Sequence, residues 1–234
     1  GNIVTYSYRD LYLQTNLDKI QPLKMRIILI FIGRICSLFI PRSLFYSWIA
    51  VKKCIFTGYM KNKFKHIGKN TLLSTNCTYH DTDCIWIGDD CSIGDYSILT
   101  AWKNYSHTNQ QFTPDIYIGN HCDIGPQSHI TAINRIVIGN NVLTGPRVLI
   151  TDNSHGEANI ELLDIAPKCR PLFTSGPVII EDNVWIGEGA MIMPNVHIGK
   201  GSIIAANSVI TKDIPPYSIA AGVPAKVIRT MTNK

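Results

Sequence analysis

A period of six residues governs the stretch from Val178 to Ile210. Isoleucine recurs at every sixth position, and a small or β-branched residue stands two positions before each isoleucine. The isoleucines are Ile180, Ile186, Ile192, Ile198, Ile204 and Ile210, and the residues before them are Val178, Val184, Ala190, Val196, Ser202 and Ser208. A helix repeats its apolar positions about every 3.6 residues and a single strand repeats them at every second residue, so neither element alone explains this pattern. Hexapeptide repetition predicts a parallel β-helix.

One short strand and one corner for every six residues would make a three-sided coil of about eighteen residues. Isoleucine would point into the prism and the smaller residue would pack near the corner. Gly187 and Gly199 directly follow their isoleucines, and we expect them to supply backbone freedom at the bend. The predicted fold class is therefore an all-β solenoid.

The same period appears earlier in the chain, with two interruptions. We expect a β-helix over residues 66–214, with loop insertions at 100–115 and 151–177. Residues 215–234 form a C-terminal cap in this scheme, because Pro215 and Pro216 lack the N–H groups that a regular strand needs. Residues 226–231 would close the cap as a short helix or strand. Loops inserted into a solenoid lie outside the stack and often carry function, so the two insertions are the first candidates for a site.

Residues 1–65 form an N-terminal arm and helical extension in the same scheme. The segment Pro22–Ile40 predicts a helix that begins after one proline and ends before Pro41. Its apolar run is shorter than a bilayer span needs, and Arg26 and Arg34 interrupt it. The remaining alternatives are a helix buried against neighbouring subunits, which we slightly favour, and a helix lying in a membrane interface. Residues 44–56 continue the helical extension.

Composition narrows the range of partners. The hydrophobic fraction of 45% is that of an ordinary globular protein. A net charge of +5 and a pI near 8.8 suit an anionic small molecule or a membrane surface. The basic residues are spread along the chain, which argues against a nucleic-acid partner. The seven cysteines form no CxxC pair, and we expect free thiols in a reducing compartment.

Three further motifs extend a resemblance beyond the repeat. They are ITDNSHG at 150–156, NVWIGEGA at 183–190 and SVITKDIPPYSIAAGVPAKVIR at 208–229. Together with the repeat, they make residues 67–229 resemble the hexapeptide-repeat acyltransferases, especially the O-acetyltransferases that act on galactosides, maltose and bacterial surface polysaccharides. The resemblance implies a left-handed β-helix, a homotrimer, and acetyl-CoA bound in grooves between adjacent subunits, without a metal.

The resemblance also assigns catalytic roles to two residues. His155 matches the family's catalytic histidine, and imidazole titrates close enough to neutral pH to accept a proton from a sugar hydroxyl. A lone loop histidine would otherwise be an exposed surface residue. The group that orients its ring is left open between Asp152, Ser154 and a backbone carbonyl. Asn134 resembles the polar residue that holds the acceptor or stabilises the oxyanion, and the alternative is a turn asparagine with left-handed backbone geometry.

The resemblance places the coenzyme along the C-terminal part of the β-helix. Lys212, Lys226 and Arg229 match phosphate-contacting positions, although related enzymes often have Arg where Lys226 stands. Ala206 and Thr211 match positions along the pantetheine arm, and Trp185 and Gly187 match the thioester end. A zinc enzyme is not expected, because the histidines do not form a converging set of three ligands.

The leading interpretation is an acetyl-CoA-dependent O-acetyltransferase acting on a sugar hydroxyl in a surface polysaccharide or its lipid-linked precursor. It would work in the cytoplasm, with membrane contact through the N-terminal region. The aromatic residues of the first insertion, Trp102, Tyr105, His107 and Phe112, would help to form the acceptor site. The alternatives are a serine or other small-molecule acetyltransferase on the same scaffold, and a non-catalytic trimeric scaffold.

Overall fold

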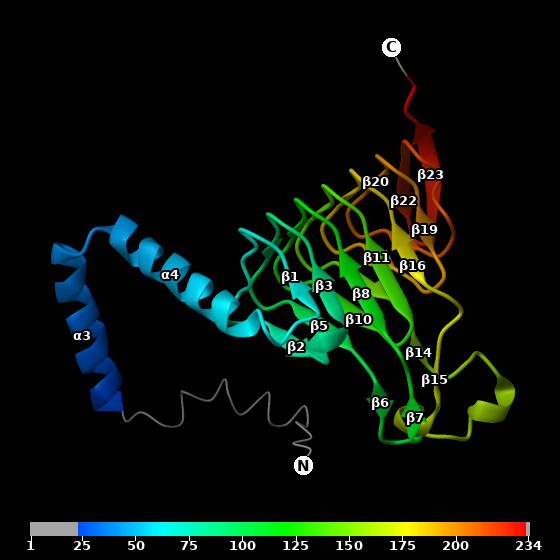
Figure 1. Ribbon diagram of the computed structural model, residues 1–234, viewed down its shortest axis with the longest axis horizontal. Coiled ribbons are helices and arrows are strands. Elements are labelled where there is room, and N and C mark those ends of the chain that lie inside the picture. Colours follow the sequence, from blue (N-terminus) through cyan, green and yellow to red (C-terminus); the bar gives the residue numbers. More distant parts are fainter. Residues whose placement is uncertain (1–22, 233–234) are drawn as a thin grey trace. The chain divides into compact units, whose positions relative to one another are not determined.

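The chain divides into two compact units, residues 1–51 and residues 52–234. The structure is a computed structural model that describes residues 23–232 (Figure 1). The expectations for the N-terminal arm and for Pro22 lie outside the described residues.

The first unit contains the predicted apolar helix. It is α3 (Leu23–Phe39), and α4 (Arg42–Met60) follows it after Pro41 and continues into the second unit. Within residues 23–232, neither helix alone is long and apolar enough to cross a membrane. The two helices reach that length only as a pair, which is bent by 115°.

The second unit is built mainly from three sheets that the chain visits in turn. Their strands are parallel except for the last one, and most are only two to four residues long (Figure 1). Sheet 1 contains, in spatial order, β1 (His66–Ile67), β3 (Ile85–Ile87), β8 (Asp115–Ile118), β11 (Arg135–Ile138), β16 (Val178–Ile180) and β19 (His197–Ile198). Sheet 2 contains β2 (Thr78–His80), β5 (Ile98–Ala101), β10 (His129–Ala132), β13 (Leu149–Thr151), β18 (Met191–Ile192) and β21 (Val209–Ile210). Sheet 3 contains β4 (Ser92–Ile93), β9 (Asp123–Ile124), β12 (Leu143–Thr144), β17 (Trp185–Ile186), β20 (Ile203–Ile204), β22 (Ser218–Gly222) and β23 (Ala225–Thr230).

The register of the strands follows the sequence period. Ile180 pairs with Ile198 in sheet 1, Ile186 pairs with Ile204 in sheet 3, and Ile192 pairs with Ile210 in sheet 2. Each pair is one three-sided coil apart, as the hexapeptide period predicts. These isoleucines are at most 1% exposed. The residues two positions before them are equally buried, so the predicted core of this stretch is confirmed.

The structure gives the glycines at the corners a different role from the one predicted from the sequence. Gly187 does not have a left-handed backbone conformation. A Cβ there would come within 2.5 Å of the Ala206 nitrogen on the next coil, so this glycine is required for close stacking of corners. Left-handed backbone occurs instead three residues after the buried isoleucine, most often at asparagine, for example at Asn183 after Ile180 and at Asn195 after Ile192.

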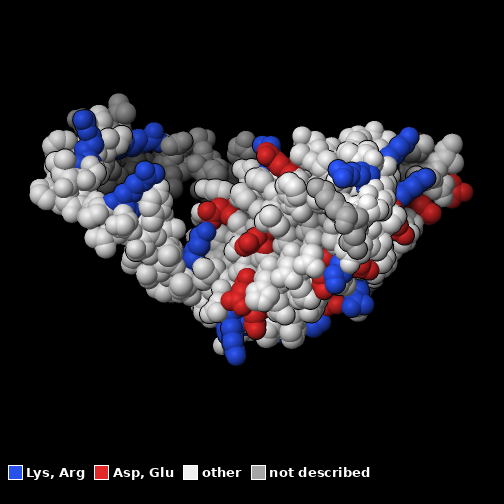
Figure 2. Space-filling model, turned by 90° about the horizontal axis from the view of Figure 1, so that it is seen from above, with Lys and Arg blue, Asp and Glu red and all other residues white. Residues whose placement is uncertain are grey.

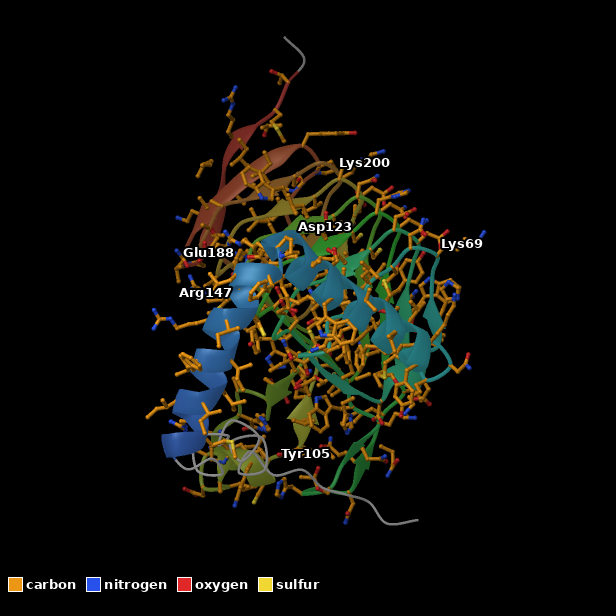
Figure 3. The ribbon with its side chains drawn as sticks, turned by 90° about the vertical axis from the view of Figure 1, so that its left-hand side faces the viewer. Lys69, Tyr105, Asp123, Arg147, Glu188 and Lys200 are labelled. Atoms are coloured by element: carbon orange, nitrogen blue, oxygen red, sulfur yellow. The ribbon has the colours of Figure 1, made fainter. Side chains whose placement is uncertain are left out.

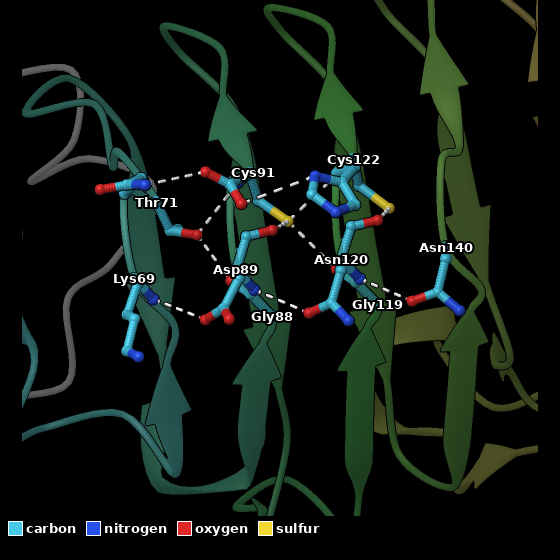
Figure 4. A network of polar contacts seen from close by, with 12 residues as sticks. Lys69, Thr71, Gly88, Asp89, Cys91, Gly119, Asn120, Cys122 and Asn140 are labelled. Atoms are coloured by element: carbon cyan, nitrogen blue, oxygen red, sulfur yellow. Dashed lines mark hydrogen bonds and ion pairs between the residues drawn. The ribbon is translucent and has the colours of Figure 1, made fainter.

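Side chains at one row of corners tie each coil to its neighbour (Figure 4). The backbone N–H of Lys69 donates to Asp89, that of Asp89 donates to Asn120, and that of Asn120 donates to Asn140. These bonds satisfy N–H groups that point along the stack at the corners. Cys91 and Cys122 lie beside this row in the small buried positions of the repeat, and all seven cysteines are free.

Both ends of the stack are covered. At the first coil, Thr57 of α4 accepts a hydrogen bond from the Leu73 N–H, and Lys53 of α4 pairs with Asp95 at 3.1 Å. At the other end, β23 turns back antiparallel to β22. The predicted closing segment is therefore a strand, and it pairs with the edge that the last coil would otherwise leave open.

Candidate active site

The two insertions leave the β-helix at the same edge. The first follows β5 and the second follows β13, and both strands lie next to β10 in sheet 2. The first insertion forms a hairpin of β6 (Asn104–Tyr105) and β7 (Gln110–Gln111). The second contains the pair β14 (Ser154–His155) and β15 (Leu172–Phe173), with two short 3-10 turns, η2 (Ile160–Leu162) and η3 (Pro167–Cys169), between them. Both hairpins hang from the lower edge in Figure 1. The turn after β10, which contains Asn134, lies on the coil between the two insertions.

His155 is exposed on β14 and pairs with Leu172 on β15. Its Nδ1 lies 3.3 Å from the Tyr105 hydroxyl, which comes from the first insertion. The two rings have centroids 5.8 Å apart. The structure thus brings together a histidine and a tyrosine from different insertions. In Figure 3, Tyr105 lies at the bottom of the view, at the opposite end from Lys200 near the top.

The hydrogen bonds of Tyr105 indicate the tautomer of His155. A phenol carries one proton, and Tyr105 donates it to the backbone carbonyl of Lys168. Burial raises the pKa of Tyr105, with a smaller contribution from Cys169, so the phenol keeps this proton at neutral pH. The Tyr105 oxygen is then an acceptor for Nδ1–H of His155. The lone pair of a neutral imidazole lies on the other nitrogen, so Nε2 is the atom that can accept a proton.

Gln110 makes a second connection between the insertions. Its amide oxygen accepts from the Leu172 N–H at 2.7 Å, and its amide nitrogen donates to the Leu172 carbonyl at 3.0 Å. Leu172 is the residue that pairs with His155. The first insertion therefore fixes the histidine through Tyr105 and fixes the partner strand through Gln110.

Asp152 has a different role from the orienting role considered for it. Its side chain is fully buried, and its two oxygens accept from the backbone N–H groups of Ile133 and Asn134, each at 2.9 Å. A third bond comes from the side chain of Asn153. Ser154 donates to the carbonyl of Gly156. The side chains of Asp152 and Ser154, both considered as groups that orient His155, therefore make their bonds elsewhere. The group that lies beside Nδ1 of His155 is the Tyr105 hydroxyl.

Asn134 does not have the left-handed geometry that was the alternative explanation for it. It lines a hollow of about 350 Å³ with Gln111, Phe112, Thr113, Ile133 and Thr174. His155 lines a separate hollow of about 690 Å³ that is formed mainly by residues 154–163 and includes Arg170 and Phe173. The two hollows have no lining residue in common. Asp152 nevertheless connects them, because it fixes the Asn134 turn and lies three residues before His155 in the chain.

Most of the expected coenzyme residues lie on or beside sheet 3. Trp185 is 52% exposed on β17 and pairs with Ile203 on β20. Ile203 pairs with Ile219 on β22, and Ile219 pairs with Arg229 on β23. Trp185 and Arg229 are thus three strands apart, or about 14 Å at normal strand spacing. The corner of Gly187 packs on Ala206, Lys226 is exposed on β23, and Thr211 and Lys212 are exposed after β21 in sheet 2.

Comparison with known proteins identifies the repeat. The bacterial transferase hexapeptide family (six repeats) matches residues 177–212. The resemblance to the hexapeptide-repeat acyltransferases is confirmed. A putative acetyltransferase of Schizosaccharomyces pombe is 44% identical over 99 residues, which are 42% of this chain and 45% of the relative.

Two bacterial proteins extend the comparison. A putative lipopolysaccharide biosynthesis O-acetyl transferase of Escherichia coli is 35% identical over 105 residues, covering 43% of this chain and 53% of the relative. A galactoside O-acetyltransferase of Escherichia coli is 41% identical over 99 residues, covering 42% and 46%. The chain thus spans about half the length of the curated relatives it matches.

Solved structures share the fold of this hexapeptide-repeat chain at low identity. AntD, an N-acyltransferase from Bacillus cereus solved with dTDP and 3-hydroxybutyryl-CoA, has a TM-score of 0.58 and 22% identity, and covers 75% of this chain and 87% of its own. A hexapeptide-repeat containing acetyltransferase from Vibrio cholerae has a TM-score of 0.52 and 22% identity, and covers 77% and 82%.

Sequence analysis singled out Tyr105 only as an aromatic residue of a possible acceptor site and did not single out Gln110. Tyr105 lies 50 residues before His155, and Gln110 lies 62 residues before Leu172. The available signal was that both insertions follow a strand on the same side of the coil, although the coil that separates them has twenty residues, from Ile130 to Ile150. In the described residues, no group of three or more His, Cys, Asp or Glu side chains is placed to hold a metal ion.

Proposed function

We propose that the protein transfers the acetyl group of acetyl-CoA to a sugar hydroxyl, with His155 as the general base. The observation that carries this proposal is the contact of Nδ1 with the Tyr105 hydroxyl, which leaves Nε2 as the proton acceptor. A positioned general base contributes about 10²- to 10⁴-fold to a rate. The names of the E. coli relatives, which are O-acetyltransferases, support this reaction class.

In the proposed reaction the sugar oxygen attacks the thioester carbonyl as Nε2 of His155 takes the hydroxyl proton. The C–O bond forms, and the carbonyl oxygen becomes an oxyanion. The side-chain amide of Asn134 would stabilise this charge from the adjoining hollow, while its backbone N–H stays bound to Asp152; such a donor is worth a few kcal/mol. The C–S bond then breaks, and the proton passes from His155 to the departing CoA thiolate. The products are the acetyl ester and CoA, and His155 is again neutral.

The coenzyme would lie along sheet 3 and the adjoining corners. Lys226 and Arg229 would meet its phosphates from β23, and Lys212 would do so from the end of β21. The pantetheine arm would pass Ala206 and Thr211, and the thioester would lie near Trp185 and Gly187. In this proposal the β-helix is left-handed and forms a homotrimer, so that the groove for CoA is completed by the neighbouring subunit. The hexapeptide repeat supports this arrangement.

The acceptor in this proposal is a sugar of a surface polysaccharide or of its lipid-linked precursor, modified at the inner face of a membrane. Support comes from the E. coli relative whose name refers to lipopolysaccharide biosynthesis. The hollow beside His155, about 690 Å³ in volume and lined by Arg170 and Phe173, could accommodate a sugar residue.

Acetyl transfer to a panel of sugars tests the proposal. His155→Ala should lose about 10²- to 10⁴-fold in kcat while its thermal unfolding is unchanged, because this side chain is exposed. His121→Ala, at another exposed histidine on a corner of the stack, is the matched control and should keep full activity. Full activity in His155→Ala would refute the role of this residue as base.

Binding measurements test the coenzyme site separately. Calorimetry with CoA should show weaker binding for Lys212→Ala and for Arg229→Ala, and unchanged binding for His155→Ala. Unchanged affinity in both cationic variants would remove them from the site. Light scattering tests the trimer, and a monomer at micromolar concentration would contradict a groove between subunits.

A further inference from the structure

The surface of α3 and the first half of α4 is unusually apolar for a protein exterior. Large apolar side chains on α3 are exposed around most of its circumference, and Leu38 and Phe39 reach 79% exposure. On α4 the apolar side chains of Leu44, Trp48 and Val51 are also exposed. Large contiguous apolar surfaces of this kind mark sites that bind a partner or a membrane.

Most polar residues of α3 lie on one side of the helix, and Lys24 in the first turn is the exception. Arg26, Gly33, Arg34 and Ser37 fall within about 100° of the circumference at 3.6 residues per turn. The opposite side carries Ile28, Phe31, Ile32, Ile35 and Phe39, all exposed, and Lys24 lies at its N-terminal end, in the first turn of the helix. A helix with a broad apolar side and arginines on the other side has the pattern of a helix that lies in a membrane interface.

The charge of this region has one sign. Between residues 23 and 80 the chain has ten Lys or Arg residues and no Asp or Glu. The structure shows three of the arginines, Arg26, Arg34 and Arg42, in the helical unit. In Figure 2 the part at the left carries blue atoms on a white surface without red. Acidic residues appear in the described chain only from Asp81 onwards.

This charge pattern decides between a membrane and a second copy of the chain as the occupant. Packing several copies of these helices together would bring many like charges together, because residues 23–80 carry ten basic and no acidic residues, and like charges repel. An anionic lipid surface instead attracts them and accepts the apolar side as well. Of the two alternatives that the sequence leaves open for this helix, the charge pattern favours the membrane interface.

We propose that α3 and the first half of α4 dock the protein on a membrane surface that contains anionic lipids. The apolar side of α3 lies among the acyl chains at the level of the headgroups, and Arg26 and Arg34 reach lipid phosphates from the other side. This docking surface shares no residue with the proposed acetyl-transfer site and does not depend on the proposed reaction.

Vesicle flotation with the full chain tests the proposal. The protein should float with phosphatidylcholine vesicles that contain phosphatidylglycerol, and far less with phosphatidylcholine alone. Binding should weaken in molar salt, which screens the lipid charge. Each basic residue near an anionic surface contributes about fivefold to partitioning, so Arg26→Gln/Arg34→Gln should lose roughly 30-fold. Lys200→Gln, an exposed lysine on a turn of the β-helix, is the control and should bind like the wild type.

The apolar side requires a second variant. Ile28→Asp/Ile35→Asp should abolish flotation while leaving unfolding of the β-helix and the oligomer size by light scattering unchanged. If this variant instead dissociates an oligomer, or if the wild type floats with neither kind of vesicle, the membrane proposal is overturned. Retention of the wild type in vesicles after alkaline carbonate washing would also overturn it, because an interfacial helix is released by that treatment.

Discussion

The coils between Val178 and Ile210 and the two insertions at 100–115 and 151–177 hold their shapes by different contacts. In the coils, every inward position repeats the same environment, and Ile180, Ile192 and Ile210 are all fully buried. In the insertions, Leu172 is the one large apolar side chain that is buried, and the shape depends on individual polar contacts. The rigid part of the molecule therefore supports the site, while the proposed chemistry depends on contacts that occur once.

This difference predicts that stability and activity respond to different substitutions. Burial of an isoleucine side chain stabilises the fold by roughly 1.5–3 kcal/mol and does so at every coil. The bond between Tyr105 and His155 adds little to that total, because both residues are near the surface. It can still determine which nitrogen of the imidazole accepts a proton.

The largest expected effect on stability lies in the coils. Ile192→Ala should lower the free energy of unfolding by about 2–5 kcal/mol, through lost burial and the cavity left behind. Met191→Ala, at the adjacent and partly exposed position of β18, is the matched control and should cost much less. Chemical denaturation measures both. Equal losses in the two variants would contradict the inward and outward assignment of this strand.

A smaller loss is expected where the coil meets the second insertion. Asp152→Ala would leave the buried N–H groups near Ile133 and Asn134 without their acceptor, and an unsatisfied buried group costs about 1–3 kcal/mol. Activity should fall as well, because the Asn134 turn loses its anchor. Asp213→Ala is the control, because its carboxylate accepts from the His197 N–H at an exposed corner. A destabilisation no larger than that of the control would show that the Asp152 bonds are not important to the fold.

Within the insertions, a substitution should change the activity and leave the stability of the fold unchanged. Tyr105→Phe should lower kcat about tenfold, which is 1.4 kcal/mol in the barrier, and leave CoA affinity and the unfolding transition unchanged. The ¹⁵N shifts of His155 should move away from the Nδ1–H tautomer, a change that a merely structural role would not produce. Tyr117→Phe, on the outer side of β8, should alter none of these quantities. An unchanged tautomer in Tyr105→Phe would contradict the orienting role.

Prediction from sequence succeeded where the environment repeats and failed where it occurs once. The period alone located the buried isoleucines and the eighteen-residue coils of the 178–210 stretch, whereas the earlier coils are longer: Ile118 pairs with Ile138 and Ile130 pairs with Ile150, each twenty residues apart. It gave the wrong reason for Gly187, because the 2.5 Å approach of Ala206 arises between coils and has no local signal. His155 was selected through the resemblance to the acyltransferases and not through the period. The sequence could not identify Tyr105 as the neighbour of His155, since 50 residues separate them and the lengths of both insertions determine where they meet. The orienting roles considered for Asp152 and Ser154 relied on proximity in sequence, which strand geometry does not preserve.

The smallest expected effect is a pH dependence in the regular coils. His129 is half-buried between Ile98 and Leu149 of the adjacent coils, and this burial lowers its pKa. The folded state therefore binds its proton less readily than the unfolded state, whose histidine pKa is about 6.5. The contribution of neutral His129 to stability is complete above the unfolded pKa and is lost as the pH falls below it towards the lower folded pKa.

Replacing His129 by Gln should remove this pH-dependent loss of stability, a difference of less than about 1.4 kcal/mol for each unit of pKa shift. The measurement is the difference in unfolding free energy between wild type and His129→Gln, taken at pH 7.5 and again near pH 5.5, so that effects common to both proteins cancel. A difference that does not change between these two pH values would show that His129 is as accessible to protons in the coil as in the unfolded chain.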